Sequence, residues 1–268
     1  SGDIDDNDAK TNGITEDAAD ISGANSKTMV YFDGGASGNI TTDTVLDGLL
    51  ITGGQASGGS GGPEASRGGG VYCGGEGNGN RCSPVISNAR VIGNSASGNG
   101  GAIFNNGFDG ESSPQLTNAT FIGNSASDNG GAIFNEGAFN GASSPQITNV
   151  TFTGNSASDS GGAIYNTGGF DNGASSPQLT NVILWENSAG SDGNEIYNGE
   201  ADPTLRYTLI QGGLPPGTND GGDNRFTSPD FVNPDDPVGP DGTFGTEDDG
   251  LRLLTGSPAL DAGDNTPF

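Results

Sequence analysis

The sequence predicts an all-β protein, a parallel β-helix of about six coils with loop-rich acidic ends. Two observations predict this fold. Short apolar strands recur at a fixed interval of about 30 residues, with glycine and asparagine pairs between them. Glycine accounts for 51 of 268 residues and hydrophobic residues for only 30%, so the chain can fill only a thin core. Units of this length bury too little surface alone and must therefore stack.

The clearest anchor of the repeat is the tetrapeptide Gly-Gly-Ala-Ile. It occurs at 100–103, 130–133 and 161–164, and diverged copies of it lie at 69–72 and 193–197. A second anchor, "SPQLTNATFIGNSA" and its variants, keeps the same phase from Thr44 to Gly212. We therefore expect one domain over residues 1–268. It would consist of an acidic segment (1–27), repeat coils (28–212) and a C-terminal capping segment (213–268).

Each unit is expected to contain three short strands, as in "AIFN", "PQLTN" and "TFIGNSA". Apolar residues lie one or two positions apart in these stretches, which is strand spacing, and no window has helical spacing. Stacking in register places equivalent side chains above one another. We expect two inner apolar ladders: Ile103, Ile133 and Ile164, then Leu116, Ile147 and Leu179.

Asparagines align at two further positions of the repeat. The two sets are Asn118, Asn149 and Asn181, and Asn94, Asn124, Asn155 and Asn187. At a bend, an asparagine amide can hydrogen-bond to the same group in the coils above and below. We therefore interpret these asparagines as structural rather than as a binding surface.

Charge and composition exclude several functions. The chain carries 34 acidic against 8 basic residues, a net charge of −26, which disfavours nucleic acid and anionic membranes as partners. The absence of histidine removes the commonest general base and most transition-metal sites. No stretch approaches 18 apolar residues, so we expect no membrane insertion.

Two cysteines, Cys73 and Cys82, lie nine residues apart across a Gly/Asn-rich turn. They could form a disulfide that closes a small loop, as is common in secreted proteins. Two free, partly buried thiols are the alternative.

Two acidic clusters lie outside the repeat and are candidate Ca²⁺ sites, because calcium prefers carboxylate and amide oxygens. The alternative is a solvated acidic surface. If calcium binds, we expect it to have a structural role. The first cluster contains Asp3, Asp5, Asn7, Asp8, Asp17 and Asp20. The second contains Asp235, Asp236, Asp241, Glu247, Asp248 and Asp249.

The combination of "GGAI" with "FIGN" and "FTGN" resembles the repeats of bacterial polymorphic outer-membrane proteins. The terminal stretches "VLDGLLITGG" and "GTEDDGLRLLTGSPALDAGDN" resemble bacterial surface domains called choice-of-anchor Q. The resemblance implies a right-handed parallel β-helix in a secreted or surface-attached protein. It also implies further chain before Ser1, so we expect a neighbouring subunit or upstream chain to complete the first coil.

Many β-helices degrade polysaccharides, but the repeat strands offer little for catalysis. Hydrolases need paired carboxylates about 5–9.5 Å apart. Glu186 and Glu195 have no obvious partner cluster, and Asp109 and Asp171 lie on variable loops. We therefore expect a non-enzymatic protein, with a carbohydrate-binding or polysaccharide-degrading β-helix as the alternative.

Two further surfaces could bind partners. A short row of threonines, Thr117, Thr148 and Thr180, could meet a flat lattice. An aromatic residue recurs on the loose loops, the variable segments 106–113, 136–144 and 167–176, as Phe108, Phe139 and Phe170. These aromatic rings could contact glycans or fold back as lids over the coil. We expect a bacterial extracellular or cell-surface protein with a structural or adhesive role. Its partners would be itself, other surface proteins or glycans, and it could be a filament subunit.

Overall fold

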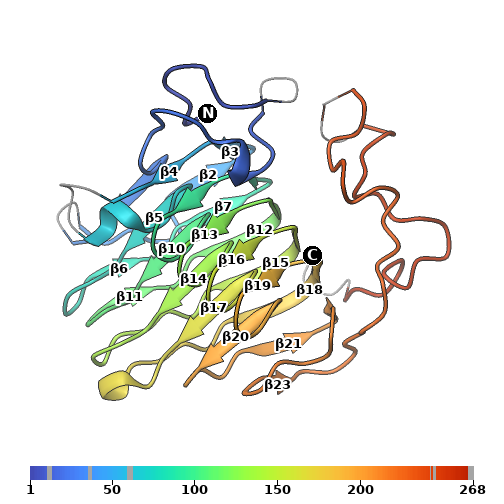
Figure 1. Ribbon diagram of the computed structural model, residues 1–268. Helices are drawn as coiled ribbons and strands as arrows, with labels where there is room; N and C mark the ends of the chain where they lie inside the picture. Colours follow the sequence, from blue (N-terminus) through green and yellow to red (C-terminus); the bar gives the residue numbers. More distant parts are fainter. Residues whose placement is uncertain (11–13, 36–37, 59–62, 242, 244–245, 265–268) are drawn as a thin grey trace.

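The chain folds into a stack of parallel β-strands that confirms the predicted β-helix (Figure 1). The computed structural model describes residues 1–10, 14–35, 38–58, 63–241, 243 and 246–264. Every pairing between named strands in this part of the chain is parallel and joins one coil to the next.

The first sheet has six strands, one from each coil, in the order β1-β5-β10-β14-β17-β20. In this sheet Ile103 pairs with Ile133, which pairs with Ile164, as the sequence predicts. The strands span Val30–Asp33, Val71–Gly74, Ile103–Asn106, Ile133–Glu136, Ile164–Thr167 and Ile196–Gly199.

The second sheet has ten strands and differs from the prediction in its middle coils. Each middle coil has one eight-residue strand instead of two short ones, and an asparagine in the left-handed conformation lies within that strand. Asn118, with φ 52°, is an example. The strands are β2 (Val45–Asp47), β3 (Leu50–Thr52), β7 (Val85–Ser87), β8 (Arg90–Ile92), β12 (Gln115–Ile122), β15 (Gln146–Thr153), β18 (Gln178–Trp185), β21 (Thr204–Arg206), β22 (Leu209–Ile210) and β23 (Asn219–Asp220).

The remaining elements are short. A five-stranded sheet pairs one dipeptide from each of five successive coils, Gln-Ala in the first and Ser-Ala in the others, and a two-stranded sheet lies beside the loose loops. The first comprises β4 (Gln55–Ala56), β9 (Ser95–Ala96), β13 (Ser125–Ala126), β16 (Ser156–Ala157) and β19 (Ser188–Ala189). The second pairs β6 (Arg81–Cys82) with β11 (Glu111–Ser112), and the 3-10 helices are η1 (Ala18–Asp20), η2 (Pro63–Ser66) and η3 (Phe170–Asn172).

The paired glycines of the repeat have separate geometric roles. Gly100 adopts φ +67°, a conformation that residues with a side chain rarely adopt. A Cβ atom on Gly101 would lie 2.2 Å from the carbonyl oxygen of Gly131 in the next coil. The first glycine therefore permits the turn, and the second permits the coils to approach closely.

The core is a column of inward-facing side chains that repeats from coil to coil. Leu116, Ile147 and Leu179 are fully buried and stack in register, as predicted. Phe121 stacks on Phe152 with ring centroids 4.8 Å apart. This in-register burial orders each coil against its neighbours and makes the stack a continuous structure.

A second aromatic stack runs along the other face of the first sheet. Its neighbouring ring centroids lie 4.8–5.6 Å apart, and the rings belong to Tyr31, Tyr72, Phe104, Phe134, Tyr165 and Tyr197. Arg67 lies 4.8 Å from the centroid of the Phe104 ring and pairs with Glu136 at 3.7 Å. The middle of this stack is therefore covered, while Tyr31 at its start is 50% exposed.

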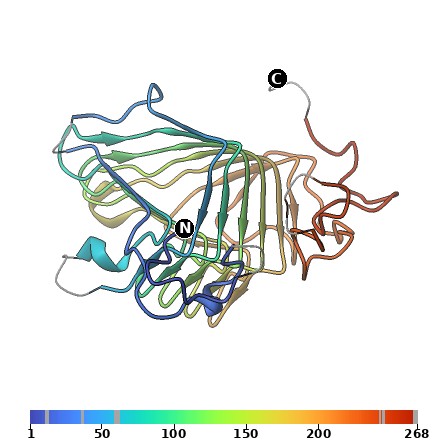
Figure 2. The same cartoon turned by 90° about the horizontal axis from the view of Figure 1, so that it is seen from above.

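Both terminal segments lie against the stack (Figures 1 and 2). Ala18 N–H donates to the carbonyl of Gly123, and the Thr52 hydroxyl donates to the carbonyl of Thr15. From the other terminus, Asp264 N–H donates to Asn181 Oδ1. Much of the predicted C-terminal capping segment thus lies along the flank. No helix in the described ranges is long and apolar enough to cross a membrane.

Candidate functional site

A buried asparagine ladder runs through the stack, as the sequence predicts. Asn94, Asn124, Asn155 and Asn187 each follow a strand of the second sheet and are at most 5% exposed. The side-chain amide of Asn124 donates to Asn155 Oδ1 at 2.8 Å, and Asn155 donates to Asn187 Oδ1 at 2.8 Å. All donors in this row therefore point toward the C-terminal end, and the last donor needs an acceptor.

Glu195 supplies that acceptor. Asn187 Nδ2 donates to Glu195 Oε2 at 2.5 Å, and the Asn187 backbone N–H donates to Oε1 at 3.4 Å. Glu195 stands where the three preceding coils have alanine, at Ala102, Ala132 and Ala163. Sequence reasoning missed this role, although the change from alanine to glutamate in the last copy of the repeat was visible.

Glu195 also has unusual electrostatics. Burial raises its pKa to about 7, and hydrogen bonds from Asn187 oppose that rise. A pocket of about 660 Å³ at this end of the stack is lined by Glu186, Asn187, Glu195, Gln211 and Leu214, among others. The structure thus brings Glu186 and Glu195 to one pocket, which the sequence did not predict.

A second buried ladder was also missed. Asn105, Asn135, Asn166 and Asn198 occupy one position of the first sheet, and each amide donates to the next side-chain oxygen at 2.8–2.9 Å. At the C-terminal end, Asn198 donates to the carbonyl of Pro216 and to the Thr218 hydroxyl. The sequence feature that could have predicted this ladder is the asparagine that follows "GGAIF" or "GGAIY" in the repeat.

The outer asparagine ladder runs in the opposite direction. Asn181 donates to Asn149, which donates to Asn118, and at the N-terminal end Asn88 donates to Asp47 Oδ1 at 2.7 Å. Hydrogen bonds from Ser87 and Asn88 lower the pKa of Asp47. Two of the three ladders therefore send their last amide donor to a carboxylate.

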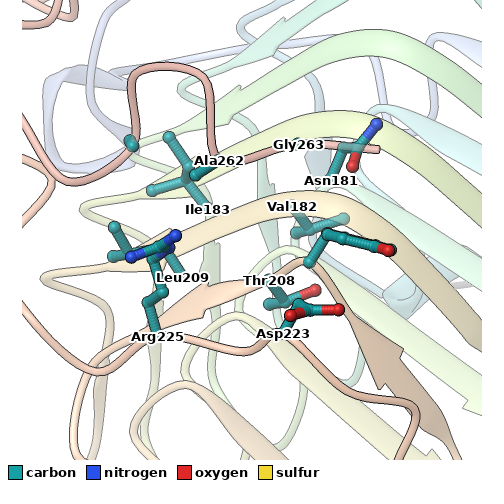
Figure 3. A pocket seen from close by; sticks show the side chains of 11 residues that line it. Asn181, Val182, Ile183, Thr208, Leu209, Asp223, Arg225, Ala262 and Gly263 are labelled. Atoms are coloured by element: carbon teal, nitrogen blue, oxygen red, sulfur yellow. The ribbon is translucent and has the colours of Figure 1, made fainter. Parts of the chain in front are cut away.

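The C-terminal segment covers the other end of the outer ladder (Figure 3). Asn181 and Gly263 lie side by side there, and a small pocket of about 100 Å³ separates the segment from β18 and β22. Ile183 and Leu209 face this segment, whereas the equivalent position of the preceding coil is Thr151. This outward position of the repeat is thus apolar in the two coils that the C-terminal segment covers.

The first predicted calcium cluster is engaged by donors from the protein. Asp3 contacts Lys10 Nζ at 2.5 Å, and this hydrogen bond lowers the pKa of Asp3. Asp8 accepts hydrogen bonds from Thr15, Ser22 N–H and Asn25. The other members have similar roles: Asp5 accepts from Asn7 and Ala24 N–H, while Asp17 and Asp20 close the capping box of η1.

The second cluster is similarly arranged. Asp248 accepts from Thr246 and from Asp241 N–H, which lowers its pKa, and Asp249 accepts from Thr246. Among the residues that the structure describes, no three His, Cys, Asp or Glu side chains form a group that could hold a metal. Calcium binding by these two clusters stays a prediction, and Glu247 belongs to no such group among the described residues.

One cleft nevertheless brings the two acidic regions together. It measures about 350 Å³, and both terminal segments line it. Asp17, Asp20, Asp235 and Glu186 line it, together with Gly123 and Gly154 of the repeat. Sequence reasoning treated these regions as separate ends of the chain.

The loose loops form a polar pocket of about 530 Å³. Asn78, Asn80, Asp109 and Asn140 line it, together with Arg81, which pairs with Glu111 at 2.7 Å. Phe108 is 40% exposed, and its ring centroid lies 4.4 Å from that of Phe139. These two rings thus pack on each other between coils. The side chain of Phe170 lies outside the described residues.

Cys73 and Cys82 form a disulfide with a Cα–Cα distance of 5.6 Å. Cys73 pairs in register with Asn105. It therefore occupies the position of the second ladder in the coil that precedes Asn105. Because a bonded cysteine offers no amide donor, Asn105 Oδ1 is buried without a hydrogen-bond partner. This is the one ladder end among the described residues that lacks a terminating contact.

Comparison with known families identifies part of the repeat. The model of the Chlamydia polymorphic membrane protein repeat matches residues 118–136 and 149–167. The chain carries two such repeats. Each begins at an asparagine of the outer ladder and extends past "GGAI" to the end of the next strand of the first sheet. No curated protein and no solved structure matches the chain.

Proposed function

We propose that the chain is a secreted or cell-surface bacterial β-helix with a structural or adhesive role, such as a rigid spacer or a filament subunit. Two observations support a location outside the cytoplasm. Polymorphic membrane protein repeats are found in outer-membrane and surface proteins. The disulfide between Cys73 and Cys82 is of a kind that persists in oxidising compartments.

The observation that carries the structural role is the continuity of the asparagine ladders. The outer ladder joins Asn88 to Asn181 through every intervening coil, and the buried ladder joins Asn94 to Asn187. The second of these ladders is buried, and buried polar groups that are hydrogen-bonded make a structure rigid and specific. A stack joined in this way resists bending, as a spacer or stalk must.

The proposed partners follow from charge. A net charge of −26 repels nucleic acid and anionic lipid, so we propose contacts with surface proteins, glycans or other copies of the chain. Insertion into a membrane is not part of the proposal. Calcium remains the proposed stabilising ion, because it would relieve repulsion among the carboxylates of the acidic cleft.

The location is tested on intact cells that make the protein. Proteinase added to these cells should degrade the chain, and immunogold particles should lie at the cell surface or on extracellular material. A cytoplasmic reporter protein serves as the control for lysis. Protection of the chain until the cells are lysed would contradict the proposal.

A polysaccharide hydrolase is the second candidate, favoured by one observation. Glu186 and Glu195 line the same pocket, and a carboxyl with a pKa near 7 can act as a general acid. The structural role of Glu195 as a ladder terminator argues against catalysis. Incubation with pectin, alginate and chondroitin decides between them. New reducing or unsaturated ends that disappear in E195Q would establish the enzyme, because glutamine keeps the acceptor oxygen.

A further inference from the structure

The polar pocket of about 530 Å³ lies beside β6 and β11, and we call it the loop pocket. Four successive coils line it, through segments 39–41, 78–81, 109–111 and 140–142. Parallel pairing between β6 and β11 holds two of these loops in register. Figure 1 shows both strands on the side of the stack away from the C-terminal segment. The volume falls in the range of small-molecule sites, about 300–1,000 Å³.

The loop pocket is held in shape by the protein itself. The disulfide closes the loop of residues 73–82, which carries one wall of the pocket. Within that loop, the Asn80 side-chain amide donates to the carbonyl of Glu76 at 2.6 Å, and its backbone N–H donates to the carbonyl of Gly77. Gly77 N–H donates in turn to the carbonyl of Phe108 in the next coil. A wall fixed in this way loses little conformational freedom when a ligand binds.

Several polar side chains of the loop pocket remain available to a ligand. Within the described ranges, the side chains of Asn78 and Asp109 form no hydrogen bond or ion pair with the protein. Arg81 and Glu111 pair with each other, yet their side chains are 49% and 34% exposed. The pocket thus offers amide and guanidinium donors beside amide and carboxylate acceptors. Neighbouring sugar hydroxyls, which both donate and accept, match such a mixed set.

Charge restricts which sugar the loop pocket accepts. Glu111 neutralises Arg81, so Asp109 supplies the remaining charge of the described lining. The chain as a whole carries a net charge of −26. Uronate, sialylated and sulfated sugars would therefore meet like charge both in the pocket and around it. An uncharged saccharide meets no such repulsion.

An exposed aromatic ring adjoins these polar groups in the chain. Phe108 directly precedes Asp109 and is 40% exposed. Across the described part of residues 51–225, no other large hydrophobic residue is comparably exposed. Phe139, 4.4 Å away between ring centroids, supports the ring from the next coil. An aromatic ring offers an apolar surface on which the C–H groups of a pyranose face can pack.

We infer that the loop pocket binds a neutral oligosaccharide. Asn78, Asp109 and Arg81 hydrogen-bond to its hydroxyls, and the Phe108 ring packs on the apolar face of one sugar ring. The inference rests on the proposed surface location, which brings the pocket into contact with glycans. It does not depend on the asparagine ladders, so the site can fail while the structural role stands.

The ligand class is tested with a glycan array and the fluorescently labelled full chain. The array holds neutral oligosaccharides of glucose, galactose, mannose and N-acetylglucosamine, each beside its sialylated, sulfated or uronate counterpart. The chain should bind at least one neutral oligosaccharide about tenfold more tightly than its acidic counterpart. Affinity should change by less than about twofold between about 0.05 and 0.5 M NaCl, because the ligand carries no charge.

The absence of binding, or tighter binding of the acidic counterparts, would overturn the inference. Either result would leave the surface location unaffected, because proteinase digestion of intact cells tests that location separately.

Protein variants locate the binding, measured by titration calorimetry with the neutral oligosaccharide that binds best on the array. N78A/D109A should lose at least about tenfold in affinity, and F108A at least about threefold. The control D192A/N233A removes an exposed aspartate and an exposed asparagine from outside the pocket lining and should bind normally. Circular dichroism confirms that the variants are folded. Unchanged affinity in N78A/D109A or in F108A, or an equal loss in the control, would overturn the inference.

Discussion

Asn187 and Glu195 form the contact that ends the buried ladder: the amide of one donates to the carboxylate of the other at 2.5 Å. In an uninterrupted repeat the acceptor would be an asparagine of the next coil. Here the acceptor comes from the same coil, eight residues later. The last coil thus carries its own terminator, and the properties of that carboxyl group can be tested.

Glu195 should make stability depend on pH between about 4.5 and 7. Burial raises its pKa from 4.5 in the unfolded chain to about 7, so the folded state favours the protonated form. Its contribution is fully present below pH 4.5 and is lost as the pH rises toward 7, by about 3 kcal/mol in total. Urea unfolding of the unmodified chain and of E195Q, which cannot ionise, should show their difference in free energy growing over this range and then levelling. A constant difference would show that Glu195 ionises normally.

Substitutions in the two ladder types should have different effects. Asn155→Ala removes an amide that bonds to Phe121, Thr153 and Asn187 inside the stack, and should cost about 3 kcal/mol in the free energy of unfolding. Asn149→Gly is the control, because Asn149 is half-buried with φ 56°, which glycine adopts readily. It should cost less than about 1 kcal/mol. Similar losses for both variants would contradict the role assigned to the buried ladder.

The disulfide and the second ladder compete for the position of Cys73. C73A/C82A should destabilise the chain by about 3 kcal/mol through loss of the cross-link. C73N/C82A should recover about 1 kcal/mol of that loss, because an asparagine amide can reach the buried Asn105 Oδ1. Chemical denaturation of the two double variants measures the difference. If C73N/C82A is no more stable than C73A/C82A, the unpartnered oxygen at Asn105 has no energetic consequence.

Calcium should raise the melting temperature if it binds the acidic segments. Asp17, Asp20, Asp235 and Glu186 line one cleft, and a divalent ion there would reduce their mutual repulsion. Melts in excess EDTA and in excess CaCl₂, matched in ionic strength with NaCl, separate binding from general screening. Identical melting temperatures would reject calcium as a stabilising ion.

The register of the coils was predictable because stacking makes equivalent residues neighbours. The pairing of Ile103 with Ile133 and the ladder from Asn124 to Asn155 follow from alignment of the repeat alone. The ends were not predictable in this way, since Glu195 and Asp47 each replace a repeat residue at a single position. Nor could alignment place Asp235 beside Asp17, because segments outside the repeat have no register to follow.

The central claim is that equivalent coils stack with a constant rise, and one distance tests it most directly. Val45 and Thr204 lie in one row, five coil steps apart. Spin labels on V45C and T204C should be separated by about 24 Å at the backbone, with the native disulfide kept. In a chain in which residues 119–149 are duplicated, the pulsed-EPR distance should increase by about 4.8 Å as a single narrow peak. An unchanged distance, or a broad distribution, would contradict the stacked β-helix.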